Sequence, residues 1–296
     1  MTSLSLEGIV MPLAGLTRLT DALWLAAHDA VRSKLQIGEW ALGVGLATGL
    51  VAELVHGGFV ELWRGELFRT RSLDGSALPD DPALFPLLSK MADEERRVQP
   101  RPASVWAPVS GGGEQRDFPG QVYGRRDLRT PSAEGHGPIS GWGHAPEEPQ
   151  WVGPDTRHRR CGHDLGEWVS YLAYERCAED LVVERLARAG LVRRQEQRRL
   201  FGGVSVRYVP ADPNVSGFAA HSISSALHAG RDLTRPQLFL AGLILATGLH
   251  HYALATSTPA ERAVLNRMLA DGLDPVSRDL LKAADVAVGE AAMRRR

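Results

Sequence analysis

The sequence predicts a mainly α-helical protein, built as a helical bundle with peripheral β-hairpins. Several segments place apolar residues at helical spacing, and many of them are bounded by capping residues, prolines or glycines. Two shorter segments alternate in polarity around a glycine-containing turn, which is typical of hairpins. The chain has 296 residues, 44% of them hydrophobic, so it is long enough to bury a sizeable core.

The expected helices differ in how their ends are marked. Thr20 is the expected cap of the first, and Gly57 with Gly58 closes the very apolar second, because glycine tolerates positive φ. Within residues 164–189 the apolar stripe is interrupted at 175–180, which indicates two consecutive helices. The expected helical segments are residues 20–29, 40–56, 82–95, 164–189, 221–229, 235–256, 259–271 and 275–293.

Two hairpins are expected between these helices. Residues 59–70 turn at Arg64 and Gly65, and residues 191–209 turn around Phe201 and its two following glycines. The second hairpin is rich in arginine, whereas the first carries charges of both signs.

The middle of the chain has a different composition. Residues 96–157 are rich in proline, glycine, arginine and serine, with no apolar period. A segment of this length without secondary structure is unusual inside a compact domain. We therefore expect a largely disordered insertion at 96–157, with residues 1–95 and 158–296 forming one helical domain.

Bulk charge and composition exclude several classes of protein. The net charge of −1 provides no global attraction to nucleic acid, and the two cysteines, Cys161 and Cys177, suit a reducing compartment. The N-terminus lacks the pattern of a signal peptide. The apolar stretches at 40–55 and 238–249 fall short of the roughly 20 residues that a membrane span needs. We expect a cytoplasmic protein that can lie at a membrane surface.

Three segments, in order, resemble one known family. Residues 51–58 read VAELVHGG, residues 183–192 read VERLARAGLV, and the apolar run 238–246 precedes a last helix ending AADVAVGEAAM. Together with the two hairpins, this order resembles the Golgi phosphoprotein 3-like (GPP34) family, in the type found in actinobacteria. The resemblance covers most of the chain outside residues 96–157 and implies a GPP34-like helical bundle.

The resemblance also implies a function at membranes. Eukaryotic members of the family bind the headgroup of phosphatidylinositol 4-phosphate on Golgi membranes and act as adaptors for other proteins. Of the family's headgroup residues, Trp40 lies near the position of the tryptophan and Arg176 matches one arginine. Ala47 and Glu179 stand where two further arginines are expected. The resemblance thus implies binding of an anionic, phosphoinositide-like lipid with part of the site replaced.

Independently of the resemblance, the second hairpin is the best candidate for a binding surface. An arginine near an anionic bilayer contributes about 1 kcal/mol, and a buried phenylalanine adds roughly 1.5–3 kcal/mol. The alternative is a solvated hairpin whose tip packs back on the body. The basic residues of the stem are Arg193, Arg194, Arg198, Arg199 and Arg207, and the tip is formed by Leu200 and Phe201.

The expected partners follow from this surface. We expect an anionic membrane lipid, a second copy of the chain paired through the hairpin, as the resemblance implies, and a protein partner, but no nucleic acid. The competing interpretation is an enzyme that acts on a lipid or isoprenoid-like substrate inside a cavity of the bundle.

Three residue pairs of the kind found in catalytic or metal sites have simpler explanations. His163 precedes Asp164, which suits a helix N-cap better than a catalytic partner. The histidine pair at 250–251 points in directions about 100° apart on a helix and is poorly placed to chelate one metal ion. The aspartate pair at 80–81 precedes a proline and suits helix capping better than binding of Mg²⁺ and a diphosphate. We predict no catalytic residue, metal or cofactor.

Overall fold

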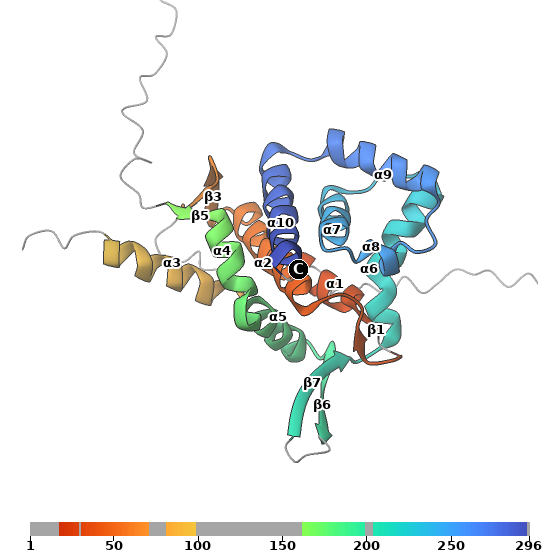
Figure 1. Cartoon of the computed structure of the whole chain (residues 1–296), viewed down its shortest axis with the longest axis horizontal. Coiled ribbons are helices and arrows are strands. Elements are labelled where there is room, and N and C mark those ends of the chain that lie inside the picture. The colour runs from red at the N-terminus through yellow and green to blue at the C-terminus, as the bar shows by residue number, and fades with distance from the viewer. Residues whose placement is uncertain (1–17, 30, 71–80, 99–161, 199–203, 295–296) are drawn as a thin grey trace, which may run out of the picture. The chain divides into compact units, whose positions relative to one another are not determined.

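The computed structural model describes residues 18–29, 31–70, 81–98, 162–198 and 204–294 (Figure 1). Most of these residues are helical, and the strands form small antiparallel sheets. The predicted fold class, mainly α with peripheral hairpins, is confirmed. The predicted insertion at 96–157 lies almost entirely outside the described residues, so the proposed division into one domain and an insertion stays a prediction. Among the described residues, no helix is long and apolar enough to span a bilayer.

Helices and short strands alternate along the described chain. The helices are α1 (Leu19–Ala27), α2 (Glu39–His56), α3 (Leu84–Val98), α4 (Leu165–Ala173), the 3₁₀ helix η2 (Tyr174–Arg176), α5 (Cys177–Arg188), α6 (Pro213–His228), α7 (Arg235–Ala246), α8 (His250–Ala253), α9 (Pro259–Gly272) and α10 (Pro275–Arg294). The strands are β1 (His28–Asp29), β2 (Lys34–Leu35), β3 (Val60–Trp63), β4 (Glu66–Arg69), β5 (His163–Asp164), β6 (Val192–Arg198) and β7 (Val204–Pro210).

Helix α2 forms the centre of the bundle. Every residue from Leu42 to Leu54 is buried, because α1, α4, α5, α7 and α10 all pack against it. A helix that is apolar on all sides belongs in the interior of a bundle. Glycine permits the closest approaches: a Cβ atom at Gly49 would lie 2.5 Å from Thr20 Cγ2 of α1, and one at Gly45 would lie 2.7 Å from Thr247 Cγ2. The helix ends at His56, followed by Gly58 at φ 70°, as its glycine pair predicted.

The hairpins form small sheets at the edges of the bundle. Strands β3 and β4 pair around Arg64 and Gly65, as expected, and β5 adds a third strand to this sheet. Strands β1 and β2 form a short pair that the sequence analysis did not anticipate. Strands β6 and β7 pair along their full length and extend away from the helices (Figure 1).

Three local predictions differ from the structure. Thr20 does not cap α1: the helix begins at Leu19 after Arg18, and Thr20 is buried, with its side chain bound to Glu53. The helix expected at 235–256 divides into α7 and α8, because Gly248 adopts a φ of 74°. Helix α6 begins at Pro213, eight residues before the expected start, because Asp212 caps it through the backbone N–H of Asn214.

Candidate functional site

The β6–β7 hairpin follows directly from α5. Gly190, at φ 70°, ends the helix region, and Val192 pairs with Pro210 at the start of the ladder. The register places Gln195 opposite Arg207 and Arg194 opposite Tyr208. Because side chains of opposed residues share a face and alternate along a strand, Arg193 and Arg207 lie on one face and Arg194 on the other.

The described arginines of the hairpin are exposed to solvent. The side chains of Arg193, Arg194 and Arg207 are all exposed. Arg194 forms an ion pair of 3.2 Å with Glu196, in which both side chains are more than half exposed. One terminal nitrogen of Arg207 donates to the carbonyl oxygen of Ser33 at 3.2 Å, which ties the hairpin base to the β1–β2 connection. Three arginines predicted as binding residues therefore remain accessible.

The predicted tip of the hairpin falls outside the described part of the chain. Arg198 is the last residue of β6, but its side chain is not described. Arg199, Leu200 and Phe201 lie outside the described residues. Their proposed contact with a membrane stays a prediction.

A cleft of about 600 Å³ lies at the base of the hairpin. It brings together side chains from β1–β2, the start of α2, the start of α5 and β7. Two predicted binding residues, Arg176 and Arg207, line the same cleft, together with Lys34. The charges are mixed, because Glu39, Glu179 and Asp180 line it as well.

Arg176 is held in this cleft by an unusual backbone. Glu175 and Arg176 have φ values of 48° and 64°, so two consecutive non-glycine residues occupy the left-handed region. Such conformations cost on the order of 1–2 kcal/mol per residue. The resulting kink separates α4 from α5, at the interruption predicted for residues 175–180, and turns Arg176 toward the first turn of α5.

The guanidinium of Arg176 already has an anionic partner. Its Nε donates to Glu179 at 2.9 Å and a terminal nitrogen donates at 2.7 Å, so the carboxylate is held at both oxygens. The hydrogen bond to Glu179 is the main reason that the pKa of Arg176 lies above its ordinary value. Trp24 Nε1 donates to Oε1 of the same carboxylate at 3.4 Å. The guanidinium of Arg176 is thus already paired with a carboxylate of its own chain.

Two other residues of the family pattern do not line the cleft. Trp40 sits in the first turn of α2, and its Nε1 donates to the carbonyl oxygen of Ala287 in α10 at 3.3 Å. Ala47 is fully buried in the middle of α2. Trp40 therefore does not line the cleft that holds Arg176, and the role of both residues in lipid binding stays a prediction.

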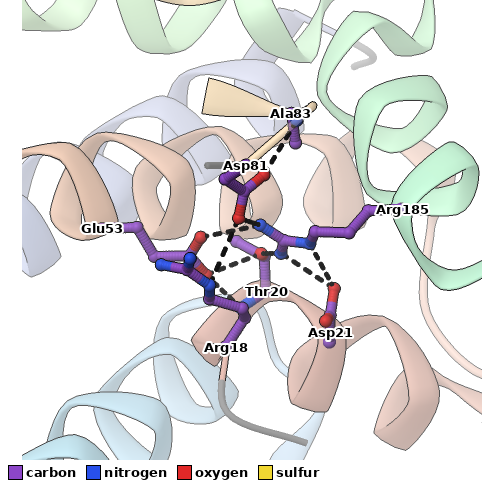
Figure 2. Close-up of polar contacts among 7 residues, drawn as sticks. All are labelled: Arg18, Thr20, Asp21, Glu53, Asp81, Ala83 and Arg185. Carbon is purple, nitrogen blue, oxygen red and sulfur yellow. Dashed lines mark hydrogen bonds and ion pairs between the residues drawn. The ribbon is translucent and has the colours of Figure 1, made fainter. Parts of the chain in front are cut away.

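A second polar cluster, centred on Arg185, is buried where α1, α2 and α5 meet the start of α3 (Figure 2). Arg185 donates to Asp21 Oδ1 through Nε at 3.0 Å and Nη2 at 2.8 Å. Its Nη1 donates to Glu53 Oε2 at 3.0 Å and to Asp81 Oδ2 at 2.9 Å. Thr20 completes the cluster by donating its hydroxyl to Glu53 Oε1 at 2.8 Å. We call these residues, with Arg18, the Arg185 cluster.

The Arg185 cluster carries more acids than bases. Arg18 adds a second cation through its Nε, 3.2 Å from Asp81, so two guanidinium groups face three carboxylates. Burial raises the pKa of Asp21 to about 6, although Arg185 acts to lower it. Burial also acts to lower the pKa of Arg185, but the attraction of Glu53 and Asp21 outweighs it and raises that pKa above its ordinary value. The cluster anchors α5, and α5 leads directly into β6.

The sequence pattern does not reveal the Arg185 cluster. Asp81 was interpreted as a helix cap, and it does accept a hydrogen bond from the Ala83 N–H at 2.8 Å, but it also binds Arg185. One signal was present: Glu53 is a lone acid inside an otherwise apolar, buried helix. A buried carboxylate needs a buried cation as partner, so this residue pointed to an ion pair.

The residues dismissed as catalytic candidates have structural roles. Asp164 caps α4 by accepting from the Glu167 N–H at 2.8 Å, as predicted. His163 is buried, with Nδ1 3.1 Å from Glu94 Oε2. The described part of the chain contains no group of three or more histidine, cysteine or acidic residues suited to a metal ion. Cys177 is a free thiol, and Cys161 lies outside the described residues.

Comparison with known proteins identifies one family. Residues 155–291 match the model described as Golgi phosphoprotein 3 (GPP34). No curated protein matches the chain. The matched region includes Arg176, Arg185 and both strands of the β6–β7 hairpin. The resemblance inferred from the sequence is therefore confirmed over residues 155–291, which match the model of the Golgi phosphoprotein 3 (GPP34) family.

Proposed function

We propose that this chain is a peripheral membrane protein that binds anionic phospholipid surfaces through its β6–β7 hairpin. The observation that carries the proposal is the position of the hairpin, which extends beyond the helices (Figure 1). The register and the exposure of Arg193, Arg194 and Arg207 place arginines on both of its faces. Arginines near an anionic bilayer each contribute about 1 kcal/mol, so a few of them are sufficient for reversible binding.

The binding is to surface charge rather than to one particular headgroup. Arg176 is engaged by Glu179, and Ala47 is buried without charge, so two elements of a phosphoinositide pocket are missing. A carboxylate held at both oxygens competes with a phosphate for the same guanidinium. At equal surface charge, vesicles with phosphatidylinositol 4-phosphate and vesicles with phosphatidylglycerol should bind the chain equally well.

Self-association is a second part of the proposal. Within the described residues, β6 and β7 pair only with each other, so each strand has an outer edge without a strand partner. Such edges can pair with the same edge of another copy. Two hairpins side by side would double the number of arginines on one surface and strengthen membrane binding. An adaptor role would further require a protein partner held at that surface.

Vesicle co-sedimentation tests the proposal. Wild-type protein should sediment with vesicles in proportion to their phosphatidylglycerol content, and added salt should release it because salt screens exposed charges. Replacing Arg198→Gln and Arg199→Gln together should weaken binding by roughly 2 kcal/mol, which is about thirtyfold.

A matched control removes the same charge elsewhere. Arg262 and Arg267 are exposed on α9, on the opposite side of the bundle from the hairpin (Figure 1). Arg262→Gln with Arg267→Gln should leave most of the binding intact. Equal losses for the two double variants would show that binding follows net charge alone, and unchanged binding of the hairpin variant would contradict the proposal.

A further inference from the structure

A separate cavity of about 320 Å³ lies at the other end of α2. Glu39 in the first turn of α2 borders the hairpin cleft, whereas His56 in the last turn borders this cavity. The helix has 18 residues, so the two sites are separated by roughly 27 Å. The cavity walls come from the start of α1, the end of α2, the start of α7 and the connection between α9 and α10.

The acids that line this cavity are already satisfied from within the protein. Glu53 belongs to the Arg185 cluster and accepts from Thr20 and Arg185. Asp274 accepts from the backbone N–H of Ser277 at 2.9 Å and from its hydroxyl at 2.6 Å. Burial acts to raise the pKa of Asp274, but these hydrogen bonds outweigh it and hold the pKa below its ordinary value. Neither acid needs a ligand.

The basic residues that line the cavity can still form hydrogen bonds or ion pairs with a ligand. Arg235 is exposed at the start of α7, and within the described residues its guanidinium has no hydrogen bond or ion pair. His56 is exposed, packs edge-on against Phe239, and lies 3.5 Å from the Ser277 hydroxyl through Nε2. Arg18 is partly exposed at the same cavity, with its Nε on Asp81. Glu53 is paired with Arg185, and Asp274 keeps its charge while it accepts hydrogen bonds from Ser277. Arg235 is therefore the cation at this cavity that can still bind an anionic group.

The remaining lining is apolar. Leu19, Phe239 and Leu273 line the cavity together with Pro236 and Gly272. Small-molecule sites typically combine such walls with a few polar groups that fix orientation, and their volumes begin near roughly 300 Å³. The size fits a ligand with a short hydrocarbon tail.

We propose that this cavity binds a small amphipathic carboxylate, with its charged head at Arg235 and Arg18 and its tail against Leu19, Phe239 and Leu273. A carboxylate would satisfy the guanidinium of Arg235 through two parallel hydrogen bonds. The proposal does not depend on membrane binding, since the hairpin lies at the other end of α2.

Calorimetric titration of the full chain with sodium octanoate tests the proposal. Octanoate should bind at one site, and Arg235→Gln should weaken its binding about tenfold, the loss expected for a charge-assisted interaction. Arg235→Lys, which keeps the charge, should retain part of the affinity. Arg231→Gln is the matched control, because Arg231 is exposed four residues earlier and does not line the cavity.

Two further ligands separate the contribution of the charged head to binding from that of the hydrocarbon tail. Octan-1-ol lacks the charge and acetate lacks the tail, so both should bind at least tenfold more weakly than octanoate. Absence of octanoate binding to the wild type, equal binding of octanol, or equal losses in the Arg235→Gln and Arg231→Gln variants would each overturn the proposal. The hairpin variant Arg198→Gln with Arg199→Gln should bind octanoate normally even if it no longer binds vesicles.

Discussion

The Arg185 cluster and the β6–β7 hairpin use the same side chain in opposite environments. Arg185 is 8% exposed and contacts three carboxylates on three different segments of the chain. The described arginines of the hairpin are exposed, and Arg194 has only the neighbouring Glu196 as an ionic partner in the contacts described.

The two environments imply different roles: the buried arginine contributes to the stability of the fold, whereas the exposed arginines are available for binding. A buried guanidinium with three acids cannot be removed without leaving those acids uncompensated. An exposed arginine contributes little to folding, because water screens its ion pairs. Several arginines gathered on a projecting hairpin therefore call for an explanation outside the fold, and contact with an anionic surface provides one.

The largest expected effect is that of replacing Arg185. Arg185→Met should lower the free energy of unfolding by about 3–5 kcal/mol, because Asp21, Glu53 and Asp81 lose their common cation. Arg188→Met is the control, since Arg188 lies in the same helix and pairs with Glu184 at the surface. Its effect should stay below about 1 kcal/mol. Urea unfolding measures the free energy of unfolding of both variants. Similar losses of stability in the two would contradict a difference between the buried and the exposed environment.

The pH dependence of stability provides the second test. Because folding raises the pKa of Asp21 from 3.8 to about 6, the folded state binds the proton more tightly. The contribution of Asp21 to stability is therefore fully present below pH 4 and declines as pH rises through 6, by about 3 kcal/mol. The free energy of unfolding measured from pH 4 to 7 should show this decline relative to Asp21→Asn. Parallel profiles for the two proteins would contradict the assigned pKa.

Relief of the kink between α4 and α5 should change the free energy of unfolding by a smaller amount and in the opposite direction. Glu175→Gly should raise the free energy of unfolding by about 1 kcal/mol, because glycine adopts the left-handed conformation without steric cost. Ser170→Gly, at an exposed position inside α4, should instead lower it by about 0.5 kcal/mol. Destabilisation by both substitutions would show that the kink is not strained.

The smallest expected effect on stability belongs to the hairpin arginines. Arg193→Gln with Arg194→Gln should change the free energy of unfolding by less than about 0.5 kcal/mol, as expected for surface substitutions. The same variant should bind phosphatidylglycerol vesicles more weakly at low salt. A loss of stability comparable to that of Arg185→Met would show that these arginines are part of the fold.

The sequence predicted most of the fold because its signals are local. A very apolar run closed by a glycine pair predicted α2, and the turn at Arg64 and Gly65 predicted β3–β4. The interruption near Glu175 predicted the break between α4 and α5. The division of α7 from α8 was missed because it depends on the positive φ of one residue, Gly248. Composition alone does not show whether a glycine within an apolar run adopts a positive φ.

The polar sites were harder to predict because they assemble residues that are distant in sequence. Arg185 lies 164 residues from Asp21 and 104 from Asp81, so no spacing rule connects them. The hairpin arginines stand out in the sequence because they are neighbours, and their role in binding stays a prediction. The pairing of Arg176 with Glu179 was visible as a reversed charge, but its geometry depends on the kink at Glu175.

The most direct test of the membrane proposal is a fluorescence measurement at the hairpin tip. With Cys161→Ser and Cys177→Ala in place, an environment-sensitive dye is attached through Phe201→Cys, or through Ala263→Cys on the exposed surface of α9 as control. On phosphatidylglycerol vesicles, emission from the tip should shift to the blue while emission from α9 stays unchanged. A tip that keeps its aqueous spectrum while the protein sediments with the vesicles would contradict docking through the hairpin.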